Sequence, residues 1–187
     1  MKIHLDVTSN GLDNPSIRKQ VEDNLRKSFK KKLPKIIERM KEVPPLFTTD
    51  VGLYSKFHNE AKECYELGLY HATISMVGVT AERFTMELSE KLKFKINENS
   101  ITEKELFGRV IRKEDIRLNI LEKAKLLKSE YTKKLKKIRE IRNKYIHPRE
   151  EENAKEDSLK ILKLYIEILN SRFSDEWIIK NGKIVKK

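Results

Sequence analysis

A short run in the C-terminal half of the chain, Arg142-Asn143-Lys144-Tyr145-Ile146-His147-Pro148, places a fixed positive charge close to an imidazole. Arginine stays protonated in proteins and can donate two parallel hydrogen bonds to a phosphate. Histidine is the side chain best suited to give or take a proton near neutrality. Because proline disfavours helical geometry in the residue before it, the run also predicts the end of a helix at His147. These features together indicate a site for phosphodiester chemistry.

Cleavage of RNA without a metal needs three things: a base for the 2'-hydroxyl proton, an acid for the departing 5'-oxygen, and positive charge beside the phosphorane. His147 is the candidate base or acid, and Arg142 is the candidate for stabilising the phosphorane. Asn143 lies one helical turn before His147, where it could orient the imidazole or the phosphate. In an ideal helix Arg142 and His147 point about 140° apart. One protomer would therefore assemble the site poorly, and we expect a homodimer.

The same residues also allow a purely structural interpretation. Arg142 interrupts an apolar stripe between Ile138 and Tyr145, and an arginine in such a place is either paired inside the fold or kept for an anion. Glu82, which lies in another apolar run, is the expected partner. In this alternative His147 only caps its helix. Both interpretations can hold, because an arginine fixed by Glu82 is also preorganised for phosphate, and we treat Glu82 as a secondary, orienting residue.

The chain is strongly basic. It has 187 residues, and its 41 lysines and arginines against 29 acidic residues give a net charge of +12. This charge favours a polyanionic partner such as RNA, with a merely solvated lysine surface as the alternative. Six basic residues lie on the same predicted helix as the run and are expected to contact RNA: Lys133, Lys134, Lys136, Lys137, Arg139 and Lys144. A further lysine cluster lies between residues 27 and 35.

Several classes of site are not expected. Cys64 is the single cysteine, so neither a disulfide framework nor a cysteine-based zinc site is predicted. None of the four histidines has metal-ligand spacing, and we therefore expect no metal and no cofactor. The chain carries no hydrophobic stretch of signal-peptide or membrane-span type, so the expected location is the cytoplasm, without membrane contact.

Apolar spacing predicts an all-α fold with a small strand appendage. Residues 1–7 alternate as in a strand, and Asn181-Gly182 favours a tight hairpin near the C-terminus. Helices are expected over 15–41 with a possible bend at Pro34, and over 49–68, 70–88, 100–112, 115–127, up to 147, and 151–173. The helix beginning at Tyr70 should be central, because its apolar residues cover two sides. We expect a single domain made of residues 1–45, a bundle over 46–173 and a hairpin over 176–187.

The order and spacing of these motifs resemble the HEPN superfamily, in which an arginine, usually followed by a polar residue, precedes a histidine at the end of a helix. Residues 142–147 have this R-x4-H form, including the asparagine after the arginine. The stretches 61–72 and 78–82 resemble the helix pair that precedes the motif in several branches. The resemblance covers roughly residues 46–173. It implies a bundle of four to five helices, often dimeric, in which the arginine and the histidine are catalytic.

Many members of that superfamily are metal-independent endoribonucleases of toxin, antiviral or RNA-processing systems. The branch paired with a nucleotidyltransferase antitoxin has a tyrosine two residues after the histidine, and here that residue is Arg149. This departure argues against that branch and against its control by adenylylation. The resemblance thus implies an endoribonuclease. The alternatives are a non-catalytic nucleotide-binding, RNA-binding or scaffold protein, and a toxin controlled by a cognate antitoxin or regulatory protein.

Overall fold

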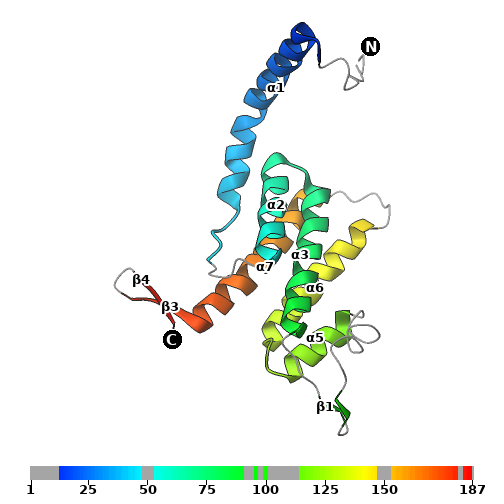
Figure 1. Cartoon of the computed structure of the whole chain (residues 1–187), viewed down its shortest axis with the longest axis vertical. Coiled ribbons are helices and arrows are strands. Elements are labelled where there is room, and N and C mark those ends of the chain that lie inside the picture. The colour runs from blue at the N-terminus through cyan, green and yellow to red at the C-terminus, as the bar shows by residue number, and fades with distance from the viewer. Residues whose placement is uncertain are drawn as a thin grey trace. The chain divides into compact units, whose positions relative to one another are not determined.

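Helices make up most of the described chain, which confirms the all-α class. The structure is a computed structural model that describes residues 13–47, 53–90, 95–96, 99–100, 114–146, 153–180 and 183–186. Its contacts divide the chain into two compact units, Met1–Met40 and Lys41–Lys187 (Figure 1). The domain boundaries expected from the sequence stay a prediction.

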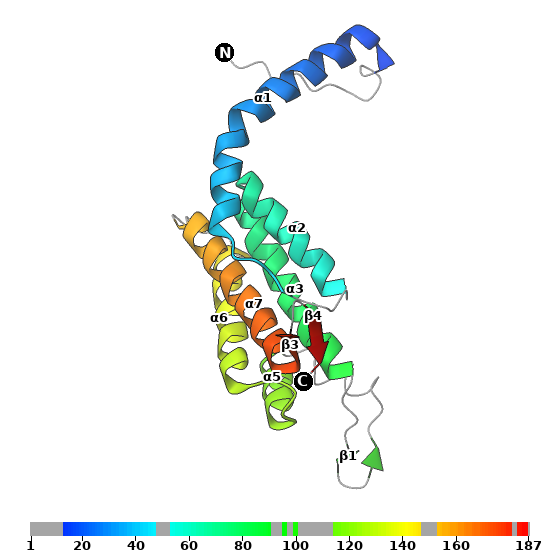
Figure 2. The same ribbon diagram turned by 90° about the vertical axis from the view of Figure 1, so that its left-hand side faces the viewer.

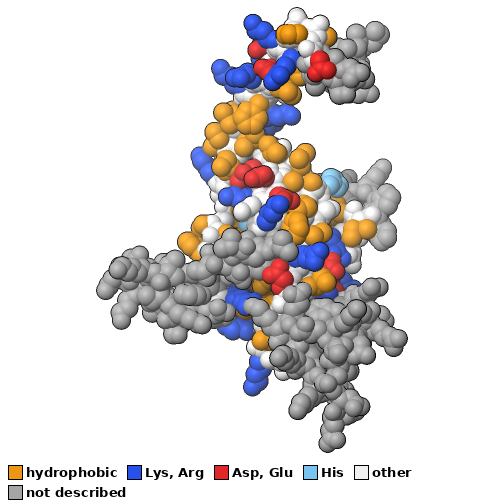
Figure 3. All heavy atoms as spheres, in the orientation of Figure 1, with side chains coloured by type: hydrophobic (Ala, Val, Ile, Leu, Met, Phe, Trp, Pro, Cys, Tyr) orange, Lys and Arg blue, Asp and Glu red, His pale blue; other side chains and the backbone are white. Residues whose placement is uncertain are grey.

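The first unit is built on one long helix, α1 (Pro15–Glu42), which extends two residues into the second unit. Pro15 occupies the first helical position, where its missing N–H is not needed, and the Asn14 Oδ1 accepts a hydrogen bond from the Ser16 N–H at 3.0 Å. Pro34 lies inside the helix. The lysines between residues 27 and 35 are exposed, and Figure 3 shows basic side chains beside apolar ones on this helix.

The second unit contains the helices α2 (Leu53–Leu67), α3 (Tyr70–Glu90), α5 (Glu114–Lys123), α6 (Ser129–Ile146) and α7 (Ala154–Glu176). As expected for the central helix, α3 packs against α2, α5, α6 and α7 (Figure 2). Its apolar residues Ile74, Val77, Ala81, Phe84 and Leu88 are all buried in the core. None of the described helices is long and apolar enough to cross a membrane.

A glycine cap joins α2 to α3. Gly68 has a φ of 82°, a conformation that side chains with a Cβ rarely adopt. The Gly68 N–H donates to the Tyr65 carbonyl at 2.9 Å, and the Leu69 N–H donates to the Cys64 carbonyl at 2.8 Å. This is the hydrogen-bond pattern of a helix ended by glycine, and it allows α3 to begin immediately, at Tyr70.

The helix expected over 115–127 is shorter than predicted, because α5 ends at Lys123. Lys125 follows with a φ of 57°, and the Leu126 N–H donates back to the Leu121 carbonyl at 3.0 Å. This turn keeps Leu127 buried, with 4% of its surface exposed, although it is no longer helical. The chain therefore turns between α5 and α6, and α6 begins at Ser129.

Two short antiparallel strand pairs complete the described chain. β3 (Trp177–Lys180) pairs with β4 (Lys183–Lys186), and β1 (Lys95–Ile96) pairs with β2 (Asn99–Ser100). The β1–β2 pair was not expected from the sequence. The last helix, α7, runs about three residues later than the predicted 151–173 at both ends. The strand expected over residues 1–7 lies outside the described residues, as do residues 101–112 of the helix expected over 100–112. Ser100, its first residue, lies in β2.

Candidate functional site

The helix α6 carries the motif, and its C-terminal end is held by contacts with α7 and α3. Leu135, Ile138 and Ile141 anchor it in the core with at most 1% of their surface exposed. In the last turn the Tyr145 hydroxyl donates to the Asp157 carboxylate on α7 at 2.9 Å. The ring of Tyr145 also meets the His71 ring of α3 edge-on, with centroids 5.5 Å apart. α6 therefore ends in a defined place at Ile146, and His147, the next residue, lies outside the described residues.

Arg142 lies across a glycine of the neighbouring helix. A Cβ built on Gly78 of α3 would be 2.2 Å from the Arg142 Cδ and 2.9 Å from its Cγ, so any side chain there would collide with the arginine. Glycine inside a helix costs roughly 0.5–1 kcal/mol relative to alanine. The close approach of Arg142 gives a physical reason for this costly residue. Gly78 and Arg142 therefore fit together as a pair, and this geometry positions the arginine.

The guanidinium of Arg142 is paired only loosely. Its Nη1 lies 3.6 Å from the Glu82 Oε2, which is the predicted ion pair but is longer than a hydrogen bond. Its Nη2 makes a long hydrogen bond of 3.4 Å to the Asn143 Oδ1. Its Nε is buried and has no hydrogen-bond partner among the described residues. The guanidinium of Arg142 thus makes one long ion pair and one long hydrogen bond with described residues.

Glu82 was expected to pair with Arg142 inside the fold, but its side chain is not buried. The side chain of Glu82 is 42% exposed, whereas that of Arg142 is 19% exposed. Glu82 belongs to α3, whose buried stripe runs through Ala81 and Phe84 on either side of it, so its side chain reaches the surface. A carboxylate that water can reach holds the arginine less tightly than a buried one would.

Further charged residues surround this pair. Arg139, one turn before Arg142, places its Nη1 2.5 Å from the Asp115 Oδ1 and its Nε 3.7 Å from the Glu114 Oε2. Arg117 of α5 is almost completely buried, with 1% of its surface exposed, and its Nε donates to the Thr85 Oγ1 at 2.9 Å. Sequence reasoning missed these α5 residues, because a charged residue within a short helix gives no local sign of burial.

The charged residues described above form an ionic cluster in which neighbouring charges act on one another: Arg142, Glu82, Arg139, Asp115, Glu114 and Arg117. Burial raises the pKa of the Glu114 carboxyl, against the opposing effect of the three arginines Arg142, Arg117 and Arg139. The hydrogen bond from Arg139 lowers the pKa of the Asp115 carboxyl. Burial lowers the pKa of the Arg117 guanidinium, while Glu114 and Glu82 oppose that effect. The cluster thus holds arginines and carboxylates in comparable number, which is how a protein keeps charge at a partly buried place.

The six basic residues expected to contact RNA fall into two groups. Some are held by carboxylates: the Lys134 Nζ lies 2.8 Å from Glu130 and 3.2 Å from Glu167. The Lys137 Nζ lies 2.9 Å from Glu140. Arg139 is paired as described above. These three side chains are therefore less available to a phosphate than the sequence suggested.

The other group is Lys133, Lys136 and Lys144. Lys133 and Lys144 are exposed and form no ion pair with another described residue, so both remain available for RNA. Lys136 is half-buried and lines a hollow beside α5. Within the described part of the chain, no group of three or more histidine, cysteine, aspartate or glutamate side chains could hold a metal ion.

Comparison of the chain with protein-family models, with curated proteins and with solved structures finds no match.

Proposed function

We propose that this chain is an endoribonuclease that cleaves RNA by attack of the 2'-hydroxyl, without a metal or cofactor, using Arg142 and His147. The observation that carries the proposal is the loosely paired guanidinium of Arg142, held over Gly78 with a buried Nε that has no partner among the described residues. His147 follows five residues later in the sequence. The resemblance of residues 142–147 to the R-x4-H motif of the HEPN superfamily supports the same assignment.

The reaction has two proton transfers and one displacement. An imidazole takes the proton of the 2'-hydroxyl, whose oxygen attacks the adjacent phosphorus while the bond to the 5'-oxygen breaks. The 5'-oxygen leaves with a proton supplied by an acid. The products are a 2',3'-cyclic phosphate and a free 5'-hydroxyl. Arg142 stabilises the negative phosphorane between these steps, and Asn143, whose amide oxygen already meets the guanidinium, helps to orient the phosphate.

Both roles for an imidazole call for a second copy of the motif. Because Arg142 and His147 are five residues apart, a helix continued from α6 would point them about 140° apart. We propose a homodimer in which the two motif helices face each other and share the site. RNA would be held by the exposed lysines Lys133 and Lys144. We propose a cytoplasmic location for such an enzyme, and the resemblance implies a toxin or antiviral defence system with a cognate antitoxin or regulatory protein.

A second candidate is a non-catalytic protein that binds RNA or a nucleotide, or serves as a scaffold. The observation that favours it is the ionic cluster, since Glu82 and Glu114 already lie near Arg142 and give it a structural reason to be there. In this alternative the cluster stabilises the contact between α3, α5 and α6. RNA binding without cleavage would then be observed.

The test is cleavage of a mixed RNA pool in EDTA by the full-length chain. We expect His147→Ala to lower the rate by about 100-fold or more, because it removes the proton-transfer group. Arg142→Lys keeps the charge but loses the forked donors and should lower the rate by about 100-fold. Circular dichroism and mass in solution should match the wild type for both.

Two matched controls remove the same chemistry elsewhere. His4→Ala deletes an imidazole outside the motif, and Arg83→Lys replaces an exposed arginine of α3. Both should cleave like the wild type. Full activity of His147→Ala would reject the motif as the site of cleavage, and RNA binding with no cleavage by the wild type would support the non-catalytic candidate.

A further inference from the structure

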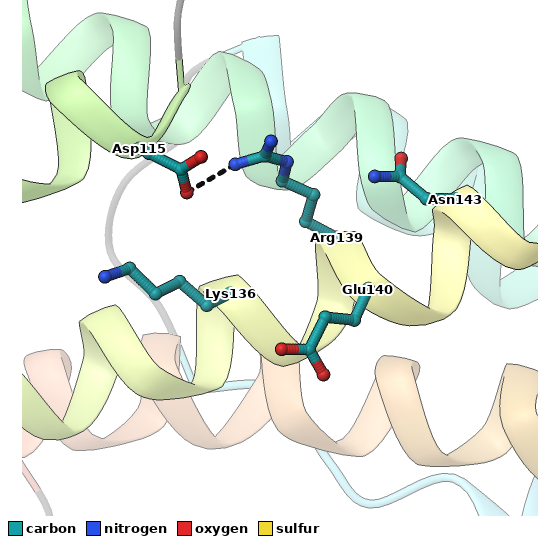
Figure 4. A pocket seen from close by; sticks show the side chains of 5 residues that line it. All are labelled: Asp115, Lys136, Arg139, Glu140 and Asn143. Carbon is teal, nitrogen blue, oxygen red and sulfur yellow. Dashed lines mark ion pairs between the residues drawn. The ribbon is translucent and has the colours of Figure 1, made fainter.

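A hollow of about 230 Å³ lies beside the arginine cluster, between α5 and α6 (Figure 4). Four residues of α6 line it, at spacings of three and four that place them on one face of the helix: Lys136, Arg139, Glu140 and Asn143. The fifth is Asp115, in the first turn of α5. Asn143 connects the hollow to the proposed site, because its amide oxygen accepts the hydrogen bond from Arg142.

The size of the hollow restricts its occupant. Sites for drug-sized ligands have volumes of about 300–1,000 Å³, so this one suits a single flat group such as one nucleobase, or one phosphate. The charge of its lining distinguishes between a nucleobase and a phosphate as the occupant. Lys136 and Arg139 are balanced by Asp115 and Glu140, and the formal charge of the lining is zero. A phosphate would face two carboxylates there, whereas a neutral base that carries both donors and acceptors would not be repelled.

The arrangement of donors and acceptors restricts the base. The Arg139 Nη1 lies 2.5 Å from the Asp115 Oδ1, an ion pair drawn as a dashed line in Figure 4. The remaining lone pairs of the carboxylate are left for hydrogen-bond donors. The Lys136 ammonium extends along the same hollow as a donor. Guanine offers the acceptors O6 and N7 on one side and amino and imino donors on the other. Uracil has no amino group, adenine has no oxygen acceptor, and cytosine has no imino donor beside its amino group, so guanine matches the lining best.

We propose that this hollow is the guanine-reading subsite of the ribonuclease proposed above, and the inference rests on that function. Asp115 accepts from the imino and amino groups of the base, and Lys136 donates to its O6. Arg139 positions the carboxylate, and Asn143 places the base next to the phosphate held by Arg142. RNA is therefore cut beside guanine.

Binding of single nucleotides tests the subsite without any cleavage. The probes are guanosine, adenosine, cytidine and uridine 3'-monophosphates, titrated calorimetrically into the full-length His147→Ala protein. We expect the guanosine nucleotide to bind at least about tenfold more tightly than the other three, because only guanine forms the bidentate pair with the Asp115 carboxylate. Asp115→Asn should remove this preference. Glu122→Gln, the same change farther along α5, should keep it.

Asp115→Asn also weakens an ion pair with Arg139, so a second variant keeps the test decisive if that protein does not fold. Lys136→Gln removes the proposed donor to O6 and leaves the pair of Asp115 and Arg139 in place. It should lose the guanine preference as well. Equal binding of all four nucleotides, or no binding of any, overturns the subsite.

Mapping of the cut positions in a random RNA separates this inference from the proposed function. The wild type should show guanine enriched beside its cuts, and Lys136→Gln should lose that bias. Cleavage with no base preference would overturn the subsite and leave the ribonuclease standing. A guanine preference in nucleotide binding, combined with no RNA cleavage, would overturn the ribonuclease and leave a nucleotide-binding site.

Discussion

Two polar side chains lie in different helix–helix contacts of the second unit: His58 is buried and neutral, whereas Arg142 is half-buried and charged. His58 of α2 meets the Tyr165 ring of α7, with ring centroids 5.8 Å apart, and only 1% of its surface is exposed. Its Nδ1 has no hydrogen-bond partner among the described residues, and burial lowers its pKa to about 4. Arg142 lies between α3 and α6, with Glu82 and Glu114 near its charge.

This fold holds a charge between α3 and α6 but keeps the side chain between α2 and α7 neutral. Between α2 and α7, the lowered pKa keeps the imidazole of His58 neutral, and this side chain contributes only to packing. Between α3 and α6, carboxylates lie close to the arginines and stabilise their charge at a partly buried place, so that this charge can act on a ligand.

Removal of Arg117 should have the largest effect. Arg117→Ala leaves the half-buried Glu114 with one counter-charge fewer and deletes a fully buried side chain, so we expect a loss of about 3–5 kcal/mol in the free energy of unfolding. Urea denaturation measures this. Lys123→Ala, an exposed basic residue of the same helix, should change the stability by less than about 0.5 kcal/mol. Equal stability of Arg117→Ala and Lys123→Ala would show that the ionic cluster does not depend on the charge of Arg117.

Acid should destabilise the protein through His58, which is buried in its neutral form between α2 and α7. The pKa of His58 is about 4 in the folded protein and 6.5 in a model peptide, so the unfolded chain binds the proton more readily. Its contribution is therefore complete above pH 6.5 and is lost as the pH falls toward 4, by about 3 kcal/mol in total. The comparison is urea denaturation of the wild type and His58→Leu from pH 7 to pH 4, where the difference between the two should shrink or reverse. Parallel curves would contradict a buried neutral imidazole.

The smallest effect concerns the fit of Gly78 and Arg142, and it should change sign. In the wild-type background Gly78→Ala should destabilise the protein by about 1 kcal/mol, because crowding against the Arg142 stem costs about 1–3 kcal/mol and exceeds the helical gain. In an Arg142→Ala background the same change should stabilise by about 0.5–1 kcal/mol. Thermal unfolding of the four proteins gives the coupling. An additive pair of changes would show that Arg142 does not lie over Gly78.

Most of the helical framework could be predicted from the sequence, because helix periodicity is local. The recurrence of apolar residues located α3 and α6, and the glycine cap at Gly68 marked the end of α2. The β1–β2 pair and the early end of α5 at Lys123 were missed. In the latter case Leu127 continues the apolar pattern, although the chain has already turned through Lys125.

The candidate site divides in the same way. The ion pair of Arg142 with Glu82 was predicted, because an arginine inside an apolar stripe needs a carboxylate nearby, and it is present in the structure. The catalytic roles of Arg142, Asn143 and His147 stay predictions. Glu114 and Asp115 were missed, because their partner Arg139 is distant in the sequence and no local pattern connects them. Tertiary pairing of this kind also explains why Lys134 and Lys137 looked more available to RNA than they are.

Attack by the 2'-hydroxyl is tested by the chemical identity of the RNA ends after cleavage in EDTA. Mass spectrometry of a short defined RNA cut by the full-length chain should show a 2',3'-cyclic phosphate on one fragment and a 5'-hydroxyl on the other. A substrate with a single 2'-deoxy sugar at the cut position should remain intact there. A 3'-hydroxyl paired with a 5'-phosphate, or equal cutting of the 2'-deoxy substrate, would contradict attack by the 2'-hydroxyl at Arg142 and His147.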